Sequence, residues 1–113
     1  MPYDAQTFGF IETPFFTKVL SRYLSDDAYA KLQAHRCARP ETGTLAPGSG
    51  GVRKMRSGVA SRGKRGGLRV IYYLRRSRTE IWMLTLYGKN VHESIPVHVL
   101  KQMKEAIDDE EAR

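Results

Sequence analysis

Cationic side chains recur at alternate positions in one short segment of the chain. Lys54 and Arg56 are two residues apart in the run Val52 to Ser57, whose alternation predicts a β-strand, so both project from one face of a sheet. Two cations about 7 Å apart on a strand are well spaced to bind one phosphate. The alternative is an edge strand whose charges prevent pairing with other chains. We favour phosphate binding, because it would compensate the repulsion between the two cations.

A glycine-rich stretch, Gly58 to Gly67, follows this strand and carries three cations, Arg62, Lys64 and Arg65. Glycines let backbone N–H groups approach an anion closely, and the cations add charge. The stretch lacks the GxxxxGK[ST] spacing of a nucleotide-binding P-loop. The alternative is a mobile hairpin loop whose charges serve only solubility.

Two later apolar runs add an arginine, tyrosines and an amide. Arg69 opens the run LRVIYYL, where it can lie beside Lys54 and Arg56 if the two strands pair. Tyr72 and Tyr73 point to opposite faces, so one packs in the core and the other could stack on a base or bind a phosphate. The next run, EIWMLTLY, ends at Tyr87, and Lys89 and Asn90 follow shortly after it. This places a phenol, a cation and an amide at the edge of the sheet. Tyr87 could equally be a core aromatic.

The charge of the chain indicates the class of partner. Nineteen Lys and Arg against twelve Asp and Glu give a net charge of +7 over 113 residues. No acid occurs between Thr42 and Thr79, a stretch that holds ten of the nineteen cations. A domain this basic usually binds a polyanion such as nucleic acid. The alternative is a solvated basic face.

The sequence lacks the residue patterns of a disulfide framework and of a metal site. One cysteine, Cys37, excludes a disulfide framework, and no HExxH motif or carboxylate cluster predicts a metal site. We expect no cofactor. Of the three histidines, His92 alone lies near the cations along the chain. The start lacks a signal peptide, and no apolar run approaches the roughly 20 residues of a membrane span, so we expect a cytoplasmic protein without a membrane partner.

The elements that must position these residues follow from periodicity and caps. Strands are expected in FGFIET and in the three runs already described, and two helices begin at the caps Thr13 and Ser25. A third helix is expected around Leu100 to Ile107, whereas Glu41 to Gly51 reads as a loop. The order β-α-α-β-β-β-α predicts one α+β domain over residues 1–113. We expect a small, mostly antiparallel sheet, with the helices covering one face.

Four blocks in order resemble the RelE/HigB family of toxins from type II toxin–antitoxin systems: GGVRKMR (50–56), RGKRGG (62–67), RVIYY (69–73) and LTLYGKN (84–90). With the opening FIETPFF, the resemblance covers about residues 8–107. It implies a RelE-like fold and an endoribonuclease that cleaves mRNA, usually in the ribosomal A site. It also implies that a cognate antitoxin silences the toxin, and that operator DNA is bound only through the antitoxin complex.

By position, Lys54 and Arg56 match the family's basic pair, Arg69 its next arginine, and Lys89 the basic residue after the last strand. The chain departs from the family after that strand, because Val91 to Val99 contains no tyrosine where many RelE-like toxins have a catalytic one. We expect either that a tyrosine elsewhere replaces it, Tyr87 or Tyr72, or that cations suffice.

RNA cleavage without a metal needs a base for the 2′-OH, a clamp for the phosphate and an acid for the leaving 5′-oxygen. Lys54 is the expected base, because nearby cations (Arg53, Arg56 and Arg69) should favour loss of its proton. Arg56 and Arg69 are the expected clamp, and Lys89 or Tyr87 the acid. The remaining expected RNA contacts are Arg53, Arg62, Lys64, Arg65, Tyr72 and Asn90.

Two other functions stay open on the same residues. A gyrase-directed, ParE-like toxin could use the same scaffold without the basic catalytic set. A non-catalytic nucleic-acid-binding module would need only the charge and the exposed tyrosines. Cleavage of ribosome-bound mRNA separates the three functions, since fold alone does not.

Overall fold

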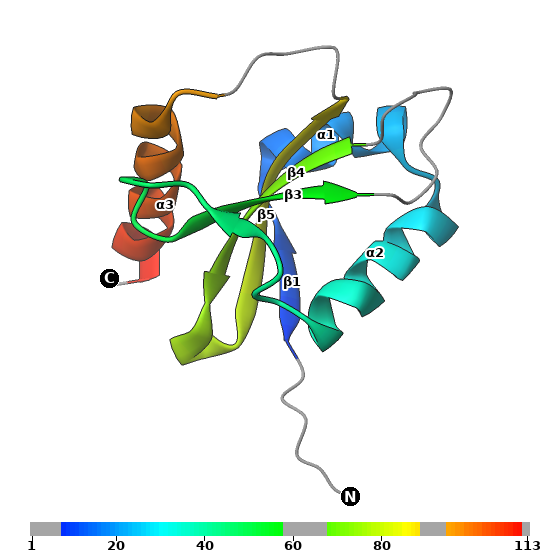
Figure 1. The fold of residues 1–113 in the computed structure, drawn as a ribbon, viewed down its shortest axis with the longest axis horizontal. Coiled ribbons are helices and arrows are strands. Elements are labelled where there is room, and N and C mark those ends of the chain that lie inside the picture. Colours follow the sequence, from blue (N-terminus) through cyan, green and yellow to red (C-terminus); the bar gives the residue numbers. More distant parts are fainter. Residues whose placement is uncertain (1–7, 58–67, 89–94, 112–113) are drawn as a thin grey trace, which may run out of the picture.

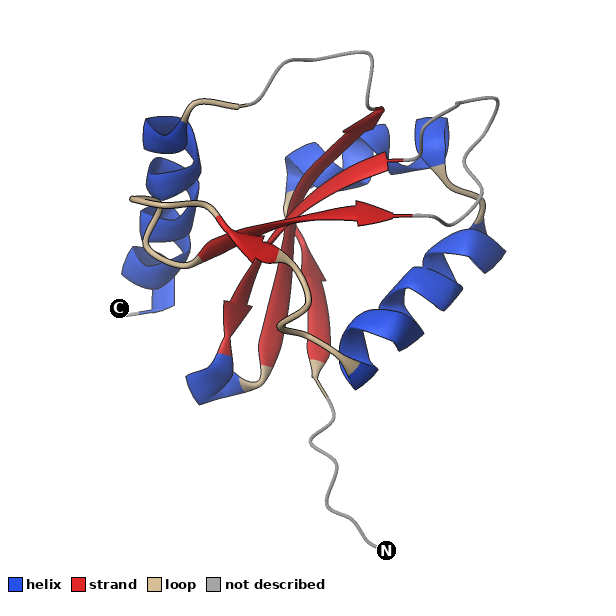
Figure 2. Ribbon diagram, in the orientation of Figure 1, coloured by secondary structure: helices blue, strands red, loops and turns tan. Residues whose placement is uncertain are grey.

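The computed structural model describes residues 8–57, 68–88 and 95–111 and contains one five-stranded sheet flanked by helices (Figures 1 and 2). The strands lie in the order β1-β5-β4-β3-β2, with β1 parallel to β5 and all other neighbours antiparallel. Their bounds are β1 (Gly9–Glu12), β2 (Thr44–Leu45), β3 (Val52–Ser57), β4 (Leu68–Arg75) and β5 (Glu80–Gly88). The predicted α+β class and mostly antiparallel sheet are confirmed.

Three helices accompany the sheet: α1 (Pro14–Tyr23), α2 (Asp26–Ala38) and α3 (Val97–Glu111). Both predicted caps form, because Thr13 Oγ1 accepts a hydrogen bond from the Phe16 amide and Ser25 Oγ accepts one from the Ala28 amide, each at 3.1 Å. In the described part of the chain, none of the helices combines the length and apolar character needed to cross a membrane.

The helices cover both faces of the sheet, so the prediction that they cover one face is wrong (Figure 1). Phe16 of α1 and Leu32 of α2 are buried against one face, and Leu100 and Ile107 of α3 against the other. The reason lies in β4 and β5, which are apolar at successive positions and not only at alternate ones. A strand that is apolar on both sides needs cover on both sides.

The segment expected to be a loop, residues 41–51, contains the short edge strand β2, whose two residues pair with Lys54 and Arg53 of β3. This strand is defined by its backbone hydrogen bonds to β3, and no apolar alternation in the sequence predicts it. The turn into β3 uses Gly50 at a φ of +83°, a region that glycine adopts without strain. The buried Ser49 hydroxyl closes the turn by donating to the Ala46 carbonyl oxygen at 2.7 Å.

Candidate functional site

Three side chains of the candidate site form a row across the sheet. Arg56 of β3 lies directly opposite Arg69 of β4, which lies directly opposite Tyr87 of β5. Side chains in such cross-strand positions have Cβ atoms about 5 Å apart. Lys54 lies two residues from Arg56 on the same face of β3. We call Lys54, Arg56, Arg69 and Tyr87 the cationic row; it lies on the sheet face that also carries α3.

The cations of this row have no counter-charge within the described parts of the chain. Lys54, Arg56 and Arg69 form no ion pair with a carboxylate in residues 8–57, 68–88 or 95–111. The Arg69 Nη1 atom is buried and has no hydrogen-bond partner among these residues. Leaving a buried donor unpaired costs about 1–3 kcal/mol, and like charges directly opposite each other repel. An anion bound here would relieve both penalties.

Tyr87 contributes to both the core and the row. Its side chain is 7% exposed and belongs to the apolar cluster that includes Leu100 and Ile107 of α3. The strand register places Tyr87 directly opposite Arg69 on the neighbouring strand. The structure therefore combines the two roles that the sequence left as alternatives, a core aromatic and a neighbour of the cations.

Arg53 and Tyr72 face away from the row, toward α1 and α2, so the structure does not bring these two expected RNA contacts together with Lys54 and Arg56. Arg53 Nη1 donates to the carbonyl oxygens of Glu41 and Gly43, at 3.0 and 2.8 Å. Tyr72 is completely buried, and its hydroxyl donates to the Pro40 carbonyl oxygen at 2.8 Å and accepts from the Gly43 amide at 3.0 Å. Both side chains anchor the segment that follows α2. Arg53 therefore does not crowd Lys54 either.

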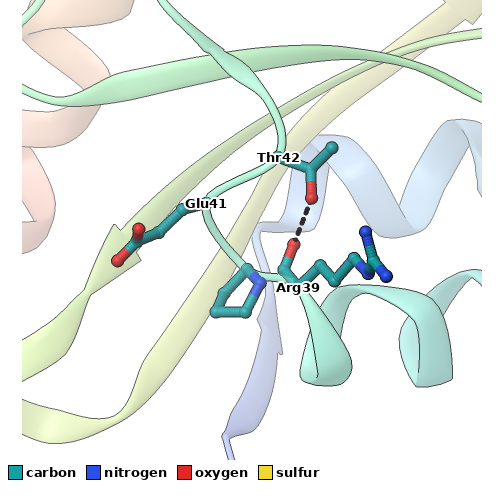
Figure 3. Close-up of a pocket in the computed structure, with 4 residues that line it drawn as sticks. Arg39, Glu41 and Thr42 are labelled. Atoms are coloured by element: carbon teal, nitrogen blue, oxygen red, sulfur yellow. Dashed lines mark hydrogen bonds between the residues drawn. The ribbon is translucent and has the colours of Figure 1, made fainter.

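A surface hollow of about 450 Å³ lies in that anchored segment and is lined by Arg39, Pro40, Glu41 and Thr42 (Figure 3). Thr42 Oγ1 donates to the Arg39 carbonyl oxygen at 2.9 Å, which closes a turn after α2. The hollow carries one cation and one carboxylate two residues apart in the sequence, Arg39 and Glu41, and it includes no member of the cationic row. Its lining does not match a phosphate-binding site.

The opposite end of the same sheet face carries cations that are paired. Arg75 lies 3.9 Å from a Glu80 carboxylate oxygen and 3.8 Å from one of Asp108. Lys104 Nζ lies 2.7 Å from the other Asp108 oxygen, and the Tyr73 hydroxyl donates to Asp108 at 3.2 Å. Burial and the Asp108 charge raise the pKa of Tyr73, and the hydrogen bond to Asp108 raises the pKa of Lys104. This network fastens α3 to the sheet.

Five predicted site residues lie outside the described residues: Arg62, Lys64, Arg65, Lys89 and Asn90. The same holds for His92. The described strands end next to the row, because Ser57, Leu68 and Gly88 are cross-strand partners one position beyond Arg56, Arg69 and Tyr87. The roles assigned to the five residues stay predictions. Among residues 8–57, 68–88 and 95–111, no group of three His, Cys, Asp or Glu side chains could hold a metal ion.

No protein-family model matches the sequence. A free RelE toxin from E. coli with two arginines changed to alanine has a TM-score of 0.60 at 12% identity, covering 88% of this chain and 98% of its own. A chain of the E. coli RelBE toxin–antitoxin complex has a TM-score of 0.54 at 12% identity, covering 76% of this chain and 100% of its own. A chain of the Pyrococcus horikoshii RelE–RelB complex has a TM-score of 0.51 at 19% identity, covering 77% of this chain and 100% of its own. The chain therefore has the RelE fold, as its four sequence blocks predicted.

Proposed function

We propose that this protein is the toxin of a type II toxin–antitoxin system and cleaves mRNA bound to the ribosome. The observation that supports this proposal is the cationic row on a RelE fold, in which Arg69 lies beside Arg56 and Tyr87 and has no carboxylate partner among the described residues. Such a site offers positive charge and hydrogen-bond donors where a phosphodiester gains charge during cleavage.

The row suits a reaction in which the RNA supplies its own nucleophile. The 2′-oxygen attacks the adjacent phosphorus while Lys54 accepts the 2′-OH proton. Arg56 and Arg69 bind the non-bridging oxygens as they gain charge, and the 5′-oxygen leaves with a proton from Tyr87 or Lys89. Tyr87 lies directly opposite Arg69, so one phosphate can contact both side chains.

Selection of mRNA is assigned to the ribosome, because a row of four side chains on a sheet offers too few contacts to read a long sequence. Two of the structures of similar fold are complexes with an antitoxin, RelBE and RelE–RelB. We propose by analogy that a cognate antitoxin binds this chain, and that operator DNA is bound through the resulting complex.

Induction of the wild-type protein alone tests this function. We expect growth to stop, translated mRNA to be cut, and growth to return when the cognate antitoxin is supplied. Purified protein should cut mRNA on programmed ribosomes. Normal growth despite soluble, accumulated protein would contradict the toxin assignment. Arrest with intact mRNA and broken chromosomal DNA would instead support a gyrase-directed toxin.

A further inference from the structure

The outward face of α1 carries a second set of groups suited to RNA. Phe15, Lys18 and Arg22 are three and four residues apart, so they share one face of the helix, and all three are exposed. We infer that this face, the α1 stripe, is an RNA-binding surface in which Phe15 stacks on an unpaired base and Lys18 and Arg22 contact phosphates. The inference rests on the proposed function, because the same RNA would extend from the cationic row.

The core does not explain the exposure of Phe15. The neighbouring Phe16 is completely buried and packs against Tyr29, with ring centroids 5.8 Å apart. Val19, Leu20 and Tyr23 complete the buried side of the helix. Phe15 remains 56% exposed, the largest value among the exposed large apolar side chains in the described residues.

The charge of the stripe is unbalanced. The helix sequence PFFTKVLSRY contains two cations and no acid. Neither Lys18 nor Arg22 forms an ion pair with a carboxylate in the segments that the structure covers. An aromatic ring beside cations is the combination that binds single-stranded nucleic acid, because the ring stacks on any base while the cations follow the backbone. An acidic protein would pair with the cations but would give the exposed ring no base to stack on.

The topology places the stripe near the cationic row. Because β1 runs parallel to β5, the helix that follows β1 starts toward the end of the sheet where Tyr87 lies. The Thr13 amide donates to the Met83 carbonyl oxygen at 3.1 Å, and Thr13 Oγ1 donates to that of Leu84 at 2.9 Å. Leu84 precedes Tyr87 by three residues, or roughly 10 Å along a strand. One RNA strand passing this end of the sheet can contact the row on one face and α1 on the other.

Binding of a short, labelled single-stranded RNA over a series of salt concentrations tests the stripe, in full-length protein carrying Arg69→Ala to prevent cleavage. We expect Phe15→Ala to weaken binding about tenfold without changing the salt dependence, since a stacked base carries no counter-charge. The double variant Lys18→Gln/Arg22→Gln should lower the slope of log K against log salt by about 1.4, or about 0.7 per lost phosphate contact.

The matched control is Lys31→Gln/Lys101→Gln, which removes the same charge from exposed positions on α2 and α3. An equal fall in slope for the control would overturn the stripe in favour of diffuse charge. Unchanged RNA affinity for Phe15→Ala would overturn it as well, and loss of polyglutamate binding by the double variant would then assign the two cations to an acidic protein. If only the α1 stripe is wrong, the wild-type protein still cleaves mRNA on ribosomes. If the proposed function is wrong, the wild-type protein does not cleave it.

Discussion

The two ends of the sheet face that carries α3 use the same residue type in opposite ways. Strand β4 has an arginine near each end of this face, Arg69 and Arg75, and both are half-buried. The cross-strand partner of Arg75 on β5 is Glu80, and α3 adds Asp108 beside it. The cross-strand partner of Arg69 is Tyr87, and no described carboxylate pairs with the Arg69 guanidinium. The two arginines therefore differ in the acids around them, and the proposed phosphate site lies at the end where no described carboxylate pairs with the arginine.

The contrast has a physical cause in the position of the acids. Glu80 opens β5 and Asp108 lies near the end of α3, so both carboxylates sit at one end of the face. There the ion pairs fasten a helix to the sheet. At the other end, no described carboxylate neutralises the cations of the row, and Arg56 and Arg69 lie opposite each other despite their repulsion.

The largest expected effect separates the two arginines. Arg69→Ala should lower cleavage of ribosome-bound mRNA a hundredfold or more, or about 3 kcal/mol of transition-state stabilisation. Its melting temperature should not fall, because no carboxylate among the described residues pairs with the Arg69 guanidinium, whereas Glu80 and Asp108 lie beside that of Arg75. The matched variant Arg75→Ala should melt earlier and cleave normally. Single-turnover cleavage and thermal melting of both variants measure this, and equal cleavage by the two would remove Arg69 from the site.

The next effect distinguishes a base from a clamp within the row. Lys54→Ala should lower the cleavage rate about a hundredfold, the lower range for general-base catalysis. Lys54→Arg should be nearly as slow, because arginine keeps its proton near neutral pH although it binds phosphate well. The measurement is single-turnover cleavage at saturating ribosome–mRNA complex. Near-wild-type cleavage by Lys54→Arg would move the role of base to Tyr87, Lys89 or His92.

The smallest effect concerns the paired end and its response to pH. Asp108→Asn should lower the free energy of unfolding at neutral pH by about 1 kcal/mol, since it removes a partly exposed acceptor from Lys104, Arg75 and Tyr73. The control is Asp109→Asn, which changes an exposed neighbour on the same helix. Urea unfolding measures both, and cleavage should be unchanged in both.

The raised pKa values of Tyr73 and Lys104 predict that the free energy of unfolding falls at alkaline pH. Folding raises the pKa of Tyr73 above 10.0 and that of Lys104 above 10.5. The folded protein thus binds these protons more tightly, so their contribution is complete below those values and is lost as the pH rises through the folded pKa values. Wild-type stability should decline over this range, and the decline should be shallower in Asp108→Asn. An identical decline in both proteins would place the alkaline response elsewhere.

The local elements and the neighbours in the row could be predicted from the sequence alone. A strand alternates its side chains whatever it pairs with, so Lys54 and Arg56 had to share a face and Arg53 had to oppose them. The same two-residue period places Tyr72 on the other face of the strand from Arg69. The sequence therefore already indicated that Tyr72 does not lie beside the cationic row. The caps at Thr13 and Ser25 were equally local, because each side chain binds an amide three residues ahead.

The tertiary structure alone decided which of these side chains were already occupied. Arg53 and Tyr72 bind carbonyl oxygens of the segment after α2, which is distant from Tyr72 in the sequence. The docking of α3 onto the second face of the sheet brings Asp108 to Arg75 and leaves Arg69 without an acid among the described residues. Periodicity specifies the face on which a side chain lies. The groups that meet it there depend on how distant elements pack, because a charge is neutralised by whichever carboxylate lies within a few ångströms in space.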